Sequence, residues 1–425
     1  MNLDISNIEN LINKKKFKEA LVQINALELK KSEDFKLLNL KGLVYLRLNE
    51  FNNSIDCFTT ALLIKKNSFL TLFYRSTSYI EIGEYHKSLK DLVDAEAINP
   101  LSHEISFNMG FVYSNLGKND EAIKYYQKTL KLKNDYTSAQ ENLIKKLNEV
   151  NSIKDSEDNI TRSHLIINKF KYKYNKSLKI TDEEIKSLFK NVTEKIKNKD
   201  ISITQTQIFK KNNINLNCER HFKVFNNFKI IPKFCFSCFK VSIKFKNVID
   251  LIKLYLVFDN VNFLNNNIRK CMIELRPKIE GNYKGFIYCS SLSEANEIKN
   301  EIRKIVENKI GDDFIIEVKR GCTEFSEKYP KYQNLKNEIM NYNKDWIKYE
   351  EIIDEKFPKF KVYNNNEKTI KGISLSDILV IKNWLYFAKI SGDQSYKKIS
   401  EEDFTNFFLT DKFQKRIDSI KNNLN

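Results

Sequence analysis

The chain has 425 residues, of which 41% are hydrophobic and 30% are charged. This composition is that of ordinary folded proteins and excludes wholesale disorder and fibrous structure, while the length predicts about two to four domains at roughly 100–200 residues each. Only 10 residues are glycine and they are scattered, which argues against the dense glycine loops of nucleotide-binding enzymes.

The positive charge is concentrated in the second part of the chain. The net charge is +17, from 72 basic and 55 acidic residues. Residues 1–150 contribute about +2 of this charge and residues 151–425 about +15. A basic balance of this size favours acidic partners such as nucleic acid, so we expect any such partner to bind the second part.

The N-terminus and the cysteines indicate the compartment. Asp4 and Glu9 stand where a signal peptide needs an uninterrupted apolar run, and the 7 cysteines are an odd number, unlike a disulfide framework. We therefore expect a cytoplasmic protein. We also expect no membrane span, because no apolar stretch reaches the length of about 20 residues that one needs.

Residues 1–149 repeat with a period of about 34 residues. Small and bulky residues each recur at this spacing: the small series are Ala20, Ser54, Ser88, Ala122 and Gly42, Ser76, Gly110, and the bulky series is Leu11, Tyr45, Tyr79, Tyr113. Two antiparallel helices approach closely only where one offers a small side chain and the other fills the gap. Each repeat is therefore predicted to be a helix pair.

This pattern resembles the tetratricopeptide repeat (TPR) family. One repeat carries the resemblance most clearly, in the residues Leu72, Ser76, Tyr79, Gly83, Tyr85, Ser88, Ala95 and Pro100. The resemblance implies that residues 1–149 form an all-α superhelix, with a last helix over 137–149 that caps the apolar end of the stack.

The same resemblance implies a concave groove that binds a segment of another protein. The residues at its groove-facing positions are Asn39, Leu43, Arg47, Phe73, Thr77, Phe107 and Phe111. They are mainly apolar and favour a partner with hydrophobic anchors, in helical or extended form. The alternative is that a later part of the same chain covers these residues.

Residues 150–200 are expected to be a linker and a connecting helix. The segment 150–175 is polar and loses the repeat, which is typical of a flexible connection. Thr181 followed by three acidic residues predicts a helix start, because the hydroxyl can cap free N–H groups and the acids favour the positive end of the helix dipole.

Residues 201–345 are expected to be a basic α+β domain. Alternation predicts a strand over 239–245, and helical spacing follows over 248–258. Two more strands over 271–276 and 284–289, a helix introduced by Ser291 and Glu294, and a strand over 314–319 complete the series. This order is that of the ferredoxin-like, split βαβ pattern.

The strand near residue 286 suggests an RNA-binding alternative. Lys284, Gly285, Phe286 and Tyr288 look like part of the RNP1 segment of RNA-recognition motifs. Phe286 and Tyr288 would share a sheet face and stack on bases, with Lys284 and Lys244 near phosphate. A buried or helix-covered sheet explains the two aromatic residues equally well.

Cysteine and histidine spacing suggests a structural zinc site. Cys218 and His221 form one close pair and Cys235 and Cys238 another, and two such pairs suit tetrahedral zinc with no open catalytic position. The alternatives are ordinary core thiols, since phenylalanines surround the second pair, or a redox pair. Cys271, Cys289 and Cys322 could extend this cluster in space, but the sequence does not place them together.

No catalytic residue is predicted, because no familiar catalytic motif occurs. A loop with Arg320, Gly321, Cys322 and Glu324 follows the last strand. Because strand ends commonly present reactive groups, an enzyme of unknown reaction in the C-terminal part remains an alternative. Residues 346–425 are expected to be an irregular segment and a helical tail, with helices over 374–390, 401–408 and 412–422.

These observations predict a TPR superhelix followed by a ferredoxin-like α+β domain and a helical tail. The expected function is a non-catalytic adaptor that binds another protein or peptide in the TPR groove. RNA binding by the basic domain is the alternative, and an enzyme is the less favoured one. The cofactor expected, if any, is structural zinc.

Overall fold

The computed structural model describes residues 5–29, 34–150, 158–169, 178–193, 201–210, 216–277, 279–358, 371–399 and 407–422. The chain divides into two compact units. Unit 1 comprises Met1–Lys146 and Asp354–Val362, and unit 2 comprises Leu147–Ile353 and Tyr363–Asn425. Within the described ranges, no helix combines the length and the apolar character that crossing a membrane requires.

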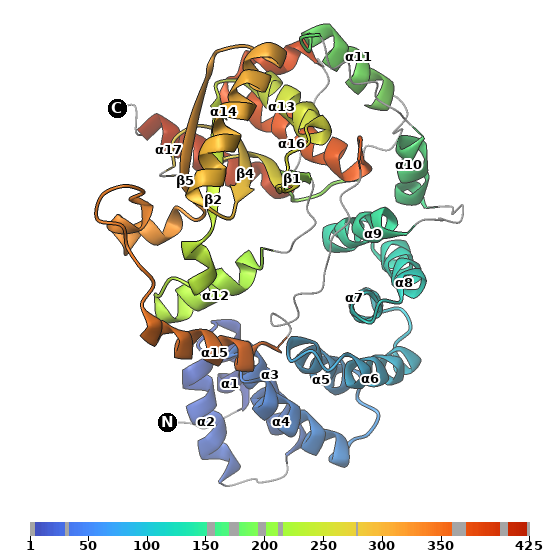
Figure 1. Cartoon of the computed structure of the whole chain (residues 1–425). Helices are drawn as coiled ribbons and strands as arrows, with labels where there is room; N and C mark the ends of the chain where they lie inside the picture. Colours follow the sequence, from blue (N-terminus) through green and yellow to red (C-terminus); the bar gives the residue numbers. More distant parts are fainter. Residues whose placement is uncertain are drawn as a thin grey trace. The chain divides into compact units, whose positions relative to one another are not determined.

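Unit 1 is a stack of helix pairs (Figure 1). The helices in chain order are α1 (Ile5–Asn13), α2 (Phe17–Glu28), α3 (Phe35–Arg47), α4 (Phe51–Ile64), α5 (Phe69–Glu81), α6 (Tyr85–Ile98), α7 (His103–Asn115), α8 (Asn119–Leu132) and α9 (Thr137–Glu149). From α1 to α8, each helix packs on the next one in the series. The helix pairs expected from the repeat are therefore confirmed.

Small residues permit the close approach of the paired helices. A Cβ on Gly42 of α3 would lie 2.7 Å from the ring of Phe58 on α4, and one on Gly110 of α7 would lie 2.8 Å from the ring of Tyr126 on α8. Ser54 is fully buried, and its hydroxyl donates to the carbonyl oxygen of Gly42 (2.8 Å). The predicted pairing of small and bulky residues thus sets the distance between the two helices.

The turn inside each pair has the same backbone conformation in all repeats. Gly83 and Gly117 have φ angles of 79° and 75°, and Lys15 and Asn49 at the matching positions have φ angles of 58° and 61°. The left-handed region suits glycine, and other residues enter it at a cost. The repeat geometry imposes this turn even where the sequence lacks glycine.

Unit 2 contains a five-stranded antiparallel sheet. The strands are β1 (Gln207–Lys210), β2 (Phe239–Phe245), β3 (Arg269–Ile273), β4 (Tyr283–Cys289) and β5 (Phe314–Arg320), in the spatial order β1-β3-β4-β2-β5. Strands β2 to β5 and the helices between them follow the predicted order. β1 is an additional edge strand, and the ferredoxin-like assignment stays a prediction.

Helices cover one face of the sheet (Figure 1). α13 (Val248–Asn260) packs on β3 and β4, and α14 (Leu292–Lys309) on β2 and β5. A Cβ on Gly285 of β4 would collide with Leu254 of α13, so glycine lets the helix approach the strand. The hydroxyl of Ser291 caps α14 by accepting from the N–H of Glu294 (3.2 Å), as predicted.

The tail packs on the sheet through α16 (Leu375–Ser391). Trp384 is fully buried, and its indole N–H donates to the carbonyl oxygen of Thr206 beside β1 (2.8 Å). The other helices of unit 2 are α10 (Asn159–Asn168), α11 (Asp182–Thr193), α12 (Cys218–Phe228), α15 (Ile347–Lys356), which continues into unit 1, and α17 (Phe407–Asn422). The helix predicted over 401–408 lies mostly outside the described residues. The linker predicted over 150–175 is described over 158–169, where it forms α10.

Candidate functional site

The predicted groove residues lie on the first helix of successive pairs. α3 carries Asn39, Leu43 and Arg47, α5 carries Phe73 and Thr77, and α7 carries Phe107 and Phe111. Arg47 is exposed and the other six are partly exposed. The face that these residues form, here called the first-helix face, is therefore accessible at every predicted position.

Contacts within unit 1 hold several of these side chains in place. The hydroxyl of Thr71 donates to Oδ1 of Asn39 (2.7 Å), which links α5 to α3. The Phe107 ring packs edge-on against Tyr136, with 5.1 Å between ring centroids. Phe73 and Phe111 pack on the core that α4, α5, α6 and α7 share. Anchors already fixed in position lose little conformational entropy when a partner binds.

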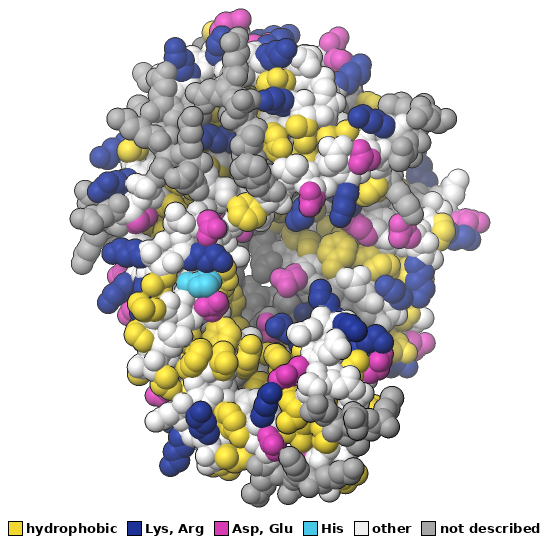
Figure 2. Space-filling model, turned by 180° about the vertical axis from the view of Figure 1, so that it is seen from behind, with side chains coloured by type: hydrophobic (Ala, Val, Ile, Leu, Met, Phe, Trp, Pro, Cys, Tyr) yellow, Lys and Arg dark blue, Asp and Glu magenta, His cyan; other side chains and the backbone are white. Residues whose placement is uncertain are grey.

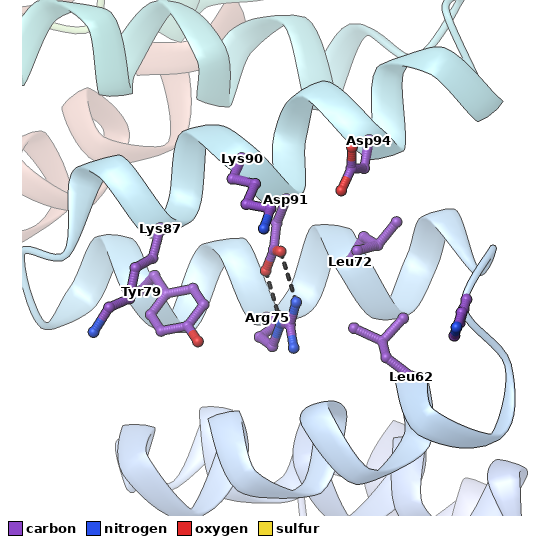
Figure 3. A pocket seen from close by; sticks show the side chains of 9 residues that line it. Leu62, Leu72, Arg75, Tyr79, Lys87, Lys90, Asp91 and Asp94 are labelled. Carbon is purple, nitrogen blue, oxygen red and sulfur yellow. Dashed lines mark hydrogen bonds and ion pairs between the residues drawn. The ribbon is translucent and has the colours of Figure 1, made fainter.

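A pocket of about 390 Å³ lies elsewhere on the repeats, between α4, α5 and α6 (Figure 3). Arg75 of α5 forms a two-pronged ion pair with Asp91 of α6, at 2.8 Å for Nε to Oδ2 and 2.7 Å for Nη2 to Oδ1. Burial raises the pKa of Asp91, although Arg75 opposes the shift. The pKa of Arg75 is raised, chiefly by its hydrogen bond to Asp91.

This pocket is on a different side of α5 from the first-helix face. At about 100° per residue, Arg75 and Tyr79 point roughly opposite to Phe73 and Thr77. Side chains of both signs border it, among them Lys66, Lys87, Lys90 and Asp94. We attribute to the Arg75–Asp91 pair a structural role, the joining of two helices.

The residues proposed for RNA binding share one face of the sheet in unit 2, opposite α13. Lys244, Lys284, Phe286 and Tyr288 alternate along β2 and β4. Phe286 is only 2% exposed and Lys284 is buried, with its ammonium 3.1 Å from a carboxylate oxygen of Glu274. A buried ring cannot stack on a base, so this structure gives the RNA alternative no platform at Phe286.

The distribution of charge in Figure 2 also gives no support to the RNA-binding alternative. Lys and Arg side chains, in dark blue, are spread over the face drawn in Figure 2 and mix with acidic ones. Lys244 itself pairs with Glu317 at 3.1 Å. Nucleic-acid sites gather positive charge on one surface, and the face in this view does not display such a concentration.

A cavity of about 470 Å³ opens on this same sheet face. Its lining combines aromatic side chains, lysines, thiols and an ion-pair network: Phe209, Phe222, Phe286, Tyr288, Lys240, Lys270, Cys218, Cys238, Cys322, Glu274, Arg276 and Glu324 are among its residues. The N-terminal turn of α12 and the loop after β5 form two of its walls. The predicted loop at Arg320–Glu324 therefore does reach a cavity.

Packing fixes the loop after β5. The N–H of Gly321 donates to the carbonyl oxygen of Cys238 (2.8 Å), and a Cβ on Gly321 would lie 2.6 Å from Sγ of Cys238. Arg320 donates to the carbonyl oxygen of Phe236 (2.6 Å). These contacts bring Cys322 and Glu324 to the cavity, from a position in the sequence far from its other walls.

Four thiols meet at this end of the cavity. Cys235 and Cys322 are hydrogen-bonded to each other, and Cys218 and Cys238 are near enough to influence the pKa of Cys322 or Cys235. The hydrogen bond from Cys235 and the charge of Lys240 lower the pKa of Cys322, against the effect of burial. Burial raises the pKa of Cys218 to about 11.

Among the described residues, the four predicted zinc ligands are not grouped around one point. The His221 ring stacks on Phe234, with 5.3 Å between centroids, and the thiols meet Cys322 instead. Across the described ranges, no group of three or more His, Cys, Asp or Glu residues is placed to hold a metal ion. Zinc stays a prediction from spacing that elemental analysis of the purified protein can check.

Sequence reasoning did not find Lys240 and Lys270. Both alternate with buried residues on strands β2 and β3, and a lysine inside a strand pattern is usually a solvated face. The signal that could have found them is the position of Lys240 on the same face as Phe286 and Tyr288 across the β2–β4 pair.

Comparisons with known proteins identify the repeats. The family model for the tetratricopeptide repeat matches residues 35–68 and 103–136, which contain the pairs α3/α4 and α7/α8. Superkiller complex protein 3 of Homo sapiens is 29% identical over 99 residues, or 23% of this chain and 6% of that protein. This chain thus matches only a small part of that relative.

Solved structures of MamA are similar to part of the chain. A crystal structure of MamA has a TM-score of 0.33 at 19% identity, over 35% of this chain and 86% of that one. MamA from Desulfovibrio magneticus RS-1 has a TM-score of 0.32 at 17% identity, over 33% and 80%. The family model and the repeat register therefore show that the first 149 residues of this chain contain tetratricopeptide repeats.

Proposed function

We propose that this protein is an adaptor whose first-helix face binds a segment of another protein. The observation that carries the proposal is the repetition of accessible residues at equivalent positions. Asn39, Phe73 and Phe107 form one row at a spacing of about 34 residues, and Leu43, Thr77 and Phe111 form a second row one helical turn further on. A surface built from repeated rows matches an elongated ligand better than a compact one.

The chemistry of this face favours a partner segment with bulky apolar side chains. Phe73, Phe107 and Phe111 supply aromatic anchors, and anchors of this type carry most of the binding energy in protein interfaces. The exposed guanidinium of Arg47 lies at the end of α3, where it can meet an acidic group flanking the apolar segment. The partner is therefore expected to be an amphipathic segment with an acidic end.

The experiment compares the proteins that co-purify with the wild-type chain and with a Phe73→Ala, Phe107→Ala variant. Loss of one anchor is expected to weaken capture by about 30-fold, because one anchor contributes on the order of 2 kcal/mol, and loss of both by up to about 1,000-fold. The matched control is Leu63→Ala with Val93→Ala, apolar residues on α4 and α6 that are 76% and 47% exposed. The control is expected to retain every partner.

A second variant separates binding from folding. Phe107 packs on neighbouring rings, so its loss could weaken the stack, whereas Arg47→Glu changes an exposed residue and reverses its charge. We expect Arg47→Glu to reduce capture of the same partner with an unchanged circular dichroism spectrum. Equal capture by wild type, Arg47→Glu and the double variant would refute the assignment of this face.

A further inference from the structure

We propose that the cavity of unit 2 binds a small organic anion, whose charged group lies between the ammonium groups of Lys240 and Lys270 and whose apolar body lies on the aromatic walls. This site is separate from the first-helix face and is independent of the adaptor function. Its argument rests on where these two lysines lie, on their lack of acidic partners and on the balance of the other charges.

The two lysines reach the same point of the sheet from opposite sides. Lys270 on β3 is directly opposite Phe286 on β4, and Lys240 on β2 is opposite Tyr288. Their ammonium nitrogens lie 5.4 Å and 4.6 Å from the centroid of the Phe286 ring. The ammonium of Lys319 on β5 lies 5.8 Å from the same centroid, but it pairs with Glu317 at 3.1 Å, so Lys240 and Lys270 are, among the described residues, the two cations at this ring that lack a carboxylate.

Neither ammonium has an ion-pair partner within the part of the chain that the structure describes. Lys240 is 5% exposed and donates to the carbonyl oxygen of Gly321, and Lys270 has a 3.5 Å contact with the side-chain oxygen of Gln207. Other buried lysines of unit 2 are paired with carboxylates: Lys210 with Asp259 and Asp377, Lys253 with Asp182, and Lys284 with Glu274.

Burial and mutual repulsion disfavour the positive charges of Lys240 and Lys270. The pKa of Lys240 is lowered to about 8, chiefly by burial and in smaller part by the charge of Lys270. Burial also lowers the pKa of Lys270. Two like charges out of water oppose each other, and an anion between them would relieve both the burial and the repulsion.

The remaining charged groups of the cavity balance each other. Arg276 forms ion pairs with Glu274 and Glu324, and Glu274 also pairs with Lys284. The uncompensated charge therefore belongs to Lys240 and Lys270, which favours an anionic ligand.

Size and lining define the rest of the ligand. A volume of about 470 Å³ is within the usual range for small-molecule sites. Phe209, Phe222 and Tyr288 supply apolar walls that suit a ring or a short hydrocarbon body. The ligand class is thus a phosphate or carboxylate attached to one small ring system.

Calorimetric titration of the full chain tests this proposal with three probes of similar shape: phenyl phosphate, benzoate and the neutral benzyl alcohol. We expect one anion to bind per chain, at least tenfold more tightly than benzyl alcohol. The anion that binds more tightly shows whether the site prefers a phosphate or a carboxylate. Absence of saturable binding by both anions at about 10 mM, or equal binding of the neutral probe, would overturn the proposal.

Lys270→Met is the decisive variant because it removes a charge and keeps the length of the side chain. We expect it to weaken binding of the better anion at least tenfold, and to raise the melting temperature of the ligand-free protein by removing an unpaired buried cation. Lys246→Met is the control, because Lys246 is 78% exposed and pairs with Asp313 at the surface, and it is expected to leave affinity unchanged.

Alkylation of Cys322 provides a second measurement of anion binding that does not depend on calorimetry. Cys322 lines the same cavity, so the bound anion should slow its alkylation by iodoacetamide, as measured on the peptide by mass spectrometry. Cys57 on α4 of unit 1, which is partly exposed and lies outside the cavity, serves as the internal control. Unchanged affinity in Lys270→Met, or a lower melting temperature together with unchanged alkylation, would show that the two lysines serve only the fold.

Discussion

Gly42→Ala tests the pairing of small and bulky residues on which the repeat unit depends. The added methyl group would lie 2.7 to 2.9 Å from three ring atoms of Phe58, and Phe58 is fully buried and cannot move into solvent. Overpacking of this kind costs about 1–3 kcal/mol, while replacing glycine within a helix regains about 1 kcal/mol. We expect a net loss of about 2 kcal/mol, because the contacts lie at the tight end of the range.

Chemical denaturation followed by circular dichroism measures this loss. A double-mutant cycle with Phe58→Leu identifies its cause, because the smaller side chain leaves room for the new methyl group. The double variant should be at least about 1 kcal/mol more stable than the sum of the two single effects. Strict additivity, or a stabilising Gly42→Ala, would refute the claim that the ring sets the distance between α3 and α4.

Three further measurements follow from the structure. Asn49 has a φ of 61°, so Asn49→Gly should stabilise the protein by up to about 1 kcal/mol in a thermal melt, and a lower stability would contradict the turn geometry. Arg75→Met should destabilise unit 1 by about 2 kcal/mol, because it leaves the 3% exposed Asp91 without its partner, and Asp91→Asn in the same background should recover part of that loss. Burial raises the pKa of Glu274, but Arg276 and other cations outweigh this effect and lower the pKa from 4.5 to about 2. The folding stability that results, about 3 kcal/mol, is present above pH 4.5 and is lost as the pH falls toward 2. Glu274→Gln should therefore flatten the dependence of unfolding free energy on pH in this range, and an unchanged dependence would contradict the reasoning.

The repeats could be predicted from the sequence because their information is local and recurs. Gly42 and Phe58, which are in close contact, lie within one helix pair. The same spacing of a small and a bulky residue recurs in the other repeats. The caps at Ser291 and Ser374 are equally local, since a hydroxyl meets an N–H three residues further along the chain. Such short-range patterns can be recognised in the sequence whatever tertiary structure surrounds the helix.

The turns of the first two repeats show a limit of this reasoning. Lys15 and Asn49 adopt the left-handed conformation that Gly83 and Gly117 adopt later. Asparagine tolerates this conformation better than most residues, but lysine does not. At Lys15 the packing of the two flanking helices offsets the cost, and no local residue preference reveals it.

The cavity and its chemistry were decided by the tertiary structure alone. Lys240, Lys270 and Cys322 come from two strands and a loop that are distant in the chain. The pairing of β2 and β3 with β4, and of β5 with β2, brings them together. His221 was assigned to a metal by its spacing from Cys218, yet its ring stacks on Phe234. Residue spacing determines which side chains can share a helix face or a strand face, whereas the meeting of distant segments depends on strand register and core packing, which a single sequence does not display.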